Sequence, residues 1–136
     1  MQNKNLPMHT YQTEITVTKE DLDELNHVNN IRYVEWVQAI AKAHWQQNVT
    51  PEINAAYFWV LIKHCIEYKS EALLNDVIIL KTYIEKSSGV KSKRIVEITN
   101  KNTQKRIAKS ETTWCLMASE TKRPARITTE ITNLFS

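Results

Sequence analysis

The chain has 136 residues, of which 42% are hydrophobic and 24% charged, and its 18 basic and 15 acidic side chains give a formal net charge of +3. Such values are ordinary for one globular domain, which at this size can bury roughly two thirds of the surface that the unfolded chain exposes. They exclude a strongly basic nucleic-acid binder, and no apolar run reaches the length of a membrane span. With no secretory signal at the start, we expect one cytoplasmic domain over residues 1–136, with its core at about 10–120.

The first predicted elements are a strand and a long helix, separated by a polar loop. Residues 10–18 alternate between apolar and polar side chains, which is the period of a half-buried strand. The loop DLDELNHVNN, residues 21–30, follows, and apolar side chains then recur every three or four positions, as on one face of a helix. We expect Asn29 or Asn30 to cap this helix and the helix to end near Gln47.

Four more strands are predicted in the second half of the chain, at 56–68, 77–86, 91–100 and 104–119. The first is too apolar to alternate, which suits a strand buried on both faces. The only glycine, Gly89, lies in a turn between two of them, and short turns predict antiparallel neighbours. The tail after them is expected to carry a short helix.

This order of elements predicts an α+β fold in which an antiparallel sheet wraps around the single long helix. One helix covers only part of such a sheet, so the sheet keeps edges that a second copy of the chain can pair with. We therefore expect at least a dimer.

The cysteines and several histidines are predicted to be structural. Cys65 and Cys115 lie in apolar strands and have no CxxC spacing, so we expect two free, buried thiols and no zinc site. His44 and His64 are expected to pack inside the protein, whereas His9 is expected to be disordered or exposed.

The segment DLDELNHVNNIRY, followed by a long helix and an IEY strand, resembles the hotdog-fold acyl thioesterases. It is similar both to 4-hydroxybenzoyl-CoA thioesterase-like enzymes and to plant fatty acyl-carrier-protein thioesterases, over about residues 10–120. The resemblance implies a hotdog fold: a five- or six-stranded antiparallel sheet around one central helix, with sheets paired in a homodimer or homotetramer. It also implies active sites at the dimer interface, an acyl-CoA or acyl carrier protein substrate, and no metal or other cofactor.

Three catalytic positions of the family match this sequence. The family's carboxylate falls on Asp23, its histidine on His27 and a further glutamate on Glu71. The catalytic asparagine of the plant enzymes falls on Leu25, and the nearest amide side chain is Asn26. The match therefore favours the simpler bacterial mechanism of this family, in which catalysis relies mainly on one carboxylate.

Thioester hydrolysis needs a base or nucleophile and a donor for the oxyanion. Asp23 suits the first role, either by attacking the carbonyl or by activating water, and the sequence leaves both open. The free amides at the start of the helix suit the second role, because the helix dipole is positive there. The resemblance places the oxyanion donor near the amide of Asn30, with His27 and Glu71 positioning water or the thioester.

Substrate-binding residues are predicted in two groups. The first lies on or near the long helix and on the next strand, and comprises Asn29, Tyr33, Trp36 and Trp59. The second is a set of basic residues around Gly89, expected to contact the phosphates of CoA: Lys86, Lys91, Lys93 and Arg94.

Two other functions on the same fold stay open. The departure at Leu25 motivates a non-catalytic module that binds or senses acyl thioesters. A hydratase or dehydratase also pairs a histidine with a carboxylate, although the continuous DxDxxxHVNN arrangement favours the thioesterase.

Overall fold

The computed structural model describes residues 9–135. Its elements, in chain order, are β1 (Thr10–Thr16), a 3-10 turn (Lys19–Asp21), α1 (Asn30–Asn48), α2 (Pro51–Ala56), β2 (Tyr57–Tyr68), β3 (Val77–Ser88), β4 (Lys91–Asn100), β5 (Arg106–Ala118) and α3 (Thr129–Asn133). The expected order is confirmed, including the short terminal helix. The additional helix α2 was not predicted; Pro51 lies in its first turn, after the capping residue Thr50.

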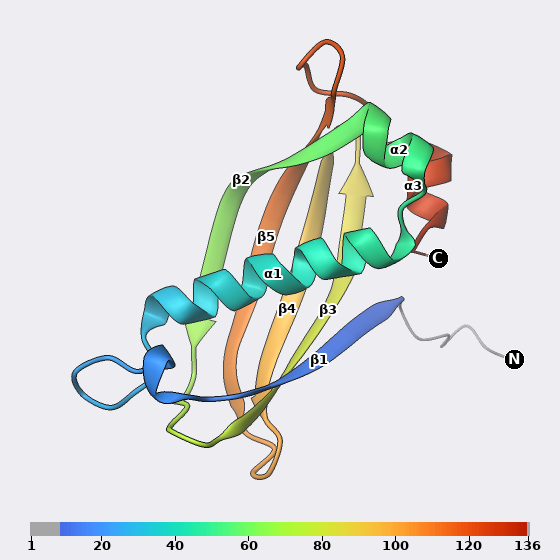
Figure 1. The fold of residues 1–136 in the computed structure, drawn as a ribbon. Coiled ribbons are helices and arrows are strands. Elements are labelled where there is room, and N and C mark those ends of the chain that lie inside the picture. The colour runs from blue at the N-terminus through green and yellow to red at the C-terminus, as the bar shows by residue number, and fades with distance from the viewer. Residues whose placement is uncertain (1–8, 136) are drawn as a thin grey trace, which may run out of the picture.

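The five strands form one antiparallel sheet in the order β1-β3-β4-β5-β2. Figure 1 shows α1 lying across one face of this sheet. Helices α2 and α3 lie together near the carboxyl end of α1, and the 21–30 loop lies at the amino end of α1. The predicted fold is therefore confirmed. The turn at Gly89 joins β3 and β4, and its φ of +65° is a conformation that glycine adopts without strain.

The main core lies between α1 and the sheet. The buried face of α1 packs against the inward side chains of β3, β4 and β5, in a cluster that includes Tyr33, Val37, Ile40, Ile78, Leu80, Val96, Ile98 and Ile107. A second cluster, built on Ile53, Leu116 and Ile131, attaches α2 and α3 to the end of the sheet beyond the helix. Together these contacts fix the position of the amino end of α1, where the predicted catalytic residues lie.

The prediction that the 56–68 strand is buried on both faces is wrong for the single chain. Among the described strands, β2 pairs only with β5 and forms an edge of the sheet. Val60 and Ile62 are 39% and 47% exposed, and Cys65 is exposed while Cys115 is buried as expected. Exposed apolar side chains along a free strand edge are typical of a surface that another chain covers.

His44 is fully buried on α1 and makes polar contacts instead of purely apolar ones. The Arg94 guanidinium lies 2.8 Å from His44 Nδ1, and His9 Nδ1 lies 2.9 Å from His44 Nε2. Because arginine can only donate, His44 Nδ1 must accept, so the proton of the neutral ring is on Nε2 and is donated to His9. His9 is therefore half-buried against His44, and the expectation that it is disordered or exposed is wrong.

Because His44 is buried in its neutral form, we expect the protein to lose stability in mild acid. Burial, followed by the charge of Arg94 and the proximity of His9, lowers the pKa of His44 from 6.5 to about 4. As the pH falls, His44 therefore takes up a proton in the unfolded chain before it does so in the folded protein. Its contribution to the free energy of unfolding is full above about pH 6.5 and is lost as the pH falls toward 4. At pH 5 the loss is about 2 kcal/mol of unfolding free energy.

Urea unfolding of the wild type and of His44→Asn, each at pH 7 and pH 5, measures this effect. The wild type is expected to lose about 2 kcal/mol more than the variant between the two pH values. Each protein serves as its own reference at pH 7, which removes the cost of the substitution itself. Equal losses in the two proteins would show that His44 is not the group responsible.

Candidate active site

Asp23 lies in a tight turn that holds its carboxylate in one orientation. Its backbone N–H donates to the carbonyl of His27 at 2.8 Å, and Asn26, with a φ of +64°, donates its N–H to the Asp23 carbonyl at 3.0 Å. The carboxylate oxygen Oδ1 accepts from the backbone N–H groups of Leu25 at 2.9 Å and His27 at 3.2 Å. No donor among residues 9–135 contacts Oδ2, so this half-buried carboxylate has one oxygen engaged and one available.

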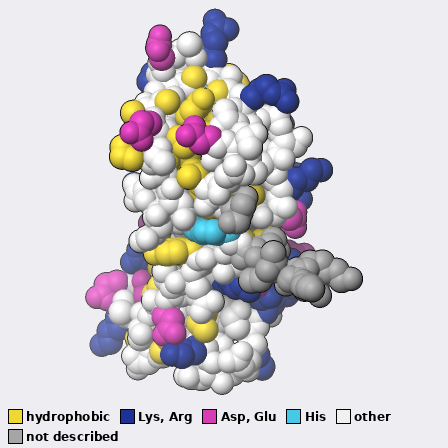
Figure 2. Space-filling model, turned by 90° about the vertical axis from the view of Figure 1, so that its right-hand side faces the viewer, with side chains coloured by type: hydrophobic (Ala, Val, Ile, Leu, Met, Phe, Trp, Pro, Cys, Tyr) yellow, Lys and Arg dark blue, Asp and Glu magenta, His cyan; other side chains and the backbone are white. Residues whose placement is uncertain are grey.

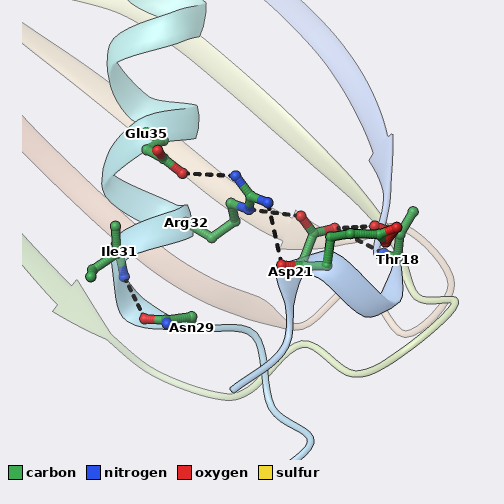
Figure 3. Close-up of polar contacts among 7 residues, drawn as sticks. Thr18, Asp21, Asn29, Ile31, Arg32 and Glu35 are labelled. Carbon is green, nitrogen blue, oxygen red and sulfur yellow. Dashed lines mark hydrogen bonds and ion pairs between the residues drawn. The ribbon is translucent and has the colours of Figure 1, made fainter. Parts of the chain in front are cut away.

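A separate contact joins this loop to the first turn of α1. Asp21 is 8% exposed and accepts from Arg32 Nε at 2.8 Å, while its other oxygen accepts from the backbone N–H of Thr18 at 2.8 Å (Figure 3). Arg32 also contacts Glu35 at 3.0 Å. Asp21 is therefore structural, and Arg32 is a positioning residue that the sequence analysis missed, because the contact depends on how the loop closes and not on a local spacing.

The amino end of α1 carries an unpaired backbone N–H. Asn29 is the N-cap, as expected: its Oδ1 accepts from the backbone N–H of Ile31 at 3.0 Å (Figure 3). The N–H of Asn29 itself donates to the carbonyl of Asp21 at 2.8 Å. The N–H of Asn30 has no acceptor within residues 9–135. An N–H at the positive end of a 19-residue helix is a suitable donor to an oxyanion.

His27 and Glu71 come together through long-range contacts. His27 Nε2 lies 3.3 Å from Glu71 Oε2, and the two side chains are 37% and 62% exposed. Glu71 is held there by its neighbour Ala72, whose N–H donates to the Tyr33 hydroxyl at 3.2 Å and whose carbonyl accepts from the N–H of Val28 at 3.1 Å.

Tyr33 therefore has a different place from the one predicted. It is 3% exposed, and its hydroxyl accepts the Ala72 amide instead of facing a substrate. Burial raises the pKa of Tyr33, so the hydroxyl stays protonated at neutral pH. Trp36 packs edge-on against Tyr33, with ring centroids 5.6 Å apart, and contributes to the core. Both aromatic residues support the loop that carries Glu71.

A cavity of about 720 Å³ lies away from the loop, beside the carboxyl-terminal half of α1. Of the predicted substrate-binding residues, Trp59, Lys86 and Arg94 line it. A shallow, open depression is lined by Tyr68, Lys69, Ser70 and Glu71, the last of which contacts His27. The predicted catalytic groups therefore lie at an open edge of the chain.

The basic residues predicted around Gly89 do not all face the same side of the sheet, because Arg94 takes the alternate face of β4. Lys86 and Lys93 are cross-strand partners, and Lys91 lies two residues from Lys93 on the same strand. Arg94 is 6% exposed and points toward α1. Lys93 lies on the opposite face of β4, where it pairs with Glu85 at 3.4 Å and Glu111 at 2.9 Å. Lys86 and Lys91 are exposed near the turn. On the face drawn in Figure 2, basic side chains are likewise dispersed and interspersed with acidic ones.

The wrapped sheet, the central helix and the loop at its tip define a hotdog fold. The thioesterase-like superfamily matches residues 17–135, so the chain belongs to this superfamily. No curated protein matches the sequence significantly.

Solved structures show the same fold. YbaW, a probable thioesterase from Escherichia coli, is 21% identical with a TM-score of 0.82, and the match covers 90% of this chain and 94% of YbaW. An Asp-to-Asn variant of 4-hydroxybenzoyl-CoA thioesterase bound to 4-hydroxybenzoyl-CoA is 10% identical with a TM-score of 0.84, over 94% and 99% of the chains. A Staphylococcus aureus protein in complex with CoA is 18% identical with a TM-score of 0.80, and the match covers 94% of this chain and 81% of that protein.

Two further features bear on the kind of site. Within residues 9–135, no group of three or more His, Cys, Asp or Glu side chains is arranged to hold a metal ion. Of the helices in the same range, none is both long enough and apolar enough to cross a membrane.

Proposed function

We propose that the protein hydrolyses acyl thioesters of CoA or acyl carrier protein, with Asp23 as general base or nucleophile and the Asn30 amide as oxyanion donor. One observation carries this proposal: a fixed carboxylate with a free oxygen and an unpaired helix-tip N–H occur on the same short loop. Membership in the thioesterase-like superfamily supports the reaction class.

The reaction follows from these groups. In the general-base route, Asp23 takes a proton from water as the water oxygen attacks the thioester carbon. In the nucleophilic route, Asp23 itself attacks, and water then hydrolyses the resulting anhydride. In both routes the carbonyl oxygen becomes negative and is stabilised by the Asn30 N–H, and the C–S bond breaks to release the thiol. In this proposal His27, paired with Glu71, orients water or moves a proton, and the exposed Asn26 is the amide side chain next in sequence to Leu25.

A second copy of the chain would complete this site. We propose a homodimer, or a tetramer built from dimers, in which the free edges of β2 pair about a two-fold axis. The exposed apolar side chains of β2 support this pairing, and so does the open depression lined by Glu71, the contact partner of His27. The partner would supply the missing wall over the helix tip.

A non-catalytic acyl-thioester binding module is the second candidate. The observation that favours it is Leu25, which is 70% exposed where the plant enzymes have a catalytic asparagine. The two functions are separated by a thiol-release screen across short, long and aromatic acyl-CoAs, combined with calorimetry. Release of the thiol with at least one class supports hydrolysis, whereas binding without release across the whole panel supports the second function. Hydration of an enoyl-CoA would instead indicate a hydratase.

A further inference from the structure

The lining of the cavity beside the carboxyl-terminal half of α1 includes six aromatic side chains: Trp45, Tyr57, Phe58, Trp59, Trp114 and Phe135. Trp45 and Trp59 meet edge to face, with ring centroids 5.6 Å apart. Its volume of about 720 Å³ is in the range of cavities that bind small organic molecules. Ala41, which lines it, lies about 16 Å along the helix axis from Asn30, at a rise of about 1.5 Å per residue. The cavity is therefore distinct from the loop that carries Asp23.

A buried cation faces this aromatic cavity. Arg94 lines it, is 6% exposed, and stays charged at neutral pH although burial lowers its pKa to about 10. Within residues 9–135 it has no carboxylate partner. Its Nη1 donates to the neutral His44 at 2.8 Å and to the Thr82 hydroxyl at 3.0 Å, while Nε and Nη2 have no acceptor in that range. Its Cζ also lies 6.0 Å from the centroid of the Phe135 ring. A buried guanidinium without a counter-ion is costly, because two neutral acceptors and a ring face do not replace an opposite charge.

The other charged residues at the cavity add to the uncompensated positive charge of Arg94. Lys42 and Lys86 line it together with one acidic residue, Glu85. The carboxylate of Glu85 already pairs with Lys93 at 3.4 Å, on the outer side of the sheet. The cavity is therefore apolar in its walls and positive in its charge, which is complementary to an anion with an apolar body.

We propose that this cavity binds a carboxylic acid with an alkyl or aromatic body. The carboxylate accepts from the free N–H groups of Arg94 in the paired geometry that guanidinium favours. The body packs against Trp45, Trp59 and the neighbouring rings. The inference rests on the cavity alone and does not depend on thioester hydrolysis at Asp23.

The first test uses the wild-type protein and two pairs of matched probes. Calorimetry compares decanoate with 1-decanol, and 2-naphthoate with 2-naphthalenemethanol. A charge-assisted pair with Arg94 is expected to make at least one acid bind about tenfold or more tightly than its alcohol. Equal affinities within both pairs, or no binding of any probe, would overturn the proposal without reference to a variant.

The second test locates the interaction. Arg94→Gln keeps a side chain that reaches His44 but removes the charge, and is expected to weaken acid binding about tenfold while alcohol binding changes little. Lys105→Gln removes an exposed charge in the turn between β4 and β5, at a residue that does not line the cavity, and is expected to bind both probes as the wild type does. Asp23→Asn is likewise expected to bind the acid normally. Arg94→Lys keeps the cation and is expected to retain the preference for the acid. If Arg94→Gln loses acid and alcohol binding equally, or loses neither, the proposal is contradicted.

Discussion

Asp23→Asn is expected to lower kcat/KM for thioester hydrolysis by about 100-fold or more while the protein stays folded. The asparagine side chain keeps an oxygen at the place of Oδ1, so the hydrogen bonds from the amides of Leu25 and His27 are preserved. What is lost is the negative charge on the free oxygen, and with it the ability to take a proton or attack the carbonyl. Steady-state thiol release measures the effect, and urea unfolding checks the fold.

The matched control is Glu24→Gln, which removes a neighbouring, exposed carboxylate of the same loop. Its kcat/KM is expected to stay within about twofold of the wild type, because an exposed charge of this kind contributes little. Asp23→Ala is less informative, since it removes the acceptor for two backbone amides together with the charge. If Asp23→Asn hydrolyses as fast as Glu24→Gln, Asp23 has no part in the reaction.

The double variant Val60→Lys with Ile62→Lys is expected to convert the proposed dimer to a monomer and to remove most of the proposed thioesterase activity. Both side chains are exposed on β2 in the single chain, and pairing of β2 edges would bring two sets of lysines together at the two-fold axis. A monomer would leave the helix tip and Asp23 open to solvent. Light scattering measures the mass, and thiol release measures the activity.

A matched change on the other edge of the sheet serves as the control. Gln12→Lys places a lysine on an exposed position of β1, which is also an edge strand, and is expected to leave both mass and activity unchanged. Dimers that persist in the β2 variant would show that the chains pair elsewhere. Full activity in a monomeric variant would show that one chain builds the whole site.

Elements set by local sequence were predicted well. The alternation in β1, the period of α1 and the turn at Gly89 each reflect neighbours along the chain, and Asn29 caps the helix as expected. The exposure of β2 was not predictable from its composition, because a strand that is buried by a partner and one that is buried within a chain have the same apolar sequence. The inward turn of Arg94 toward His44 likewise depends on how β4 and α1 are packed.

The same distinction applies to the site. Asp23, His27 and Asn30 share one loop, so their proximity follows from the sequence. Glu71 reaches His27 only because the loop that carries it hydrogen-bonds to Val28 and Tyr33. Because these are contacts between residues distant in sequence, the sequence did not reveal that Tyr33 supports this loop, and Tyr33 was predicted to bind substrate instead.

A crystal structure of the D23N variant with an intact acyl-CoA bound would test the proposed site most directly. We expect a thioester whose carbonyl oxygen lies within about 3 Å of the Asn30 backbone nitrogen. We also expect the substituted side chain at position 23 to lie beside the carbonyl carbon, under a wall supplied by the second protomer. A thioester bound elsewhere, or one whose carbonyl faces away from the amino end of α1, would contradict the proposed site.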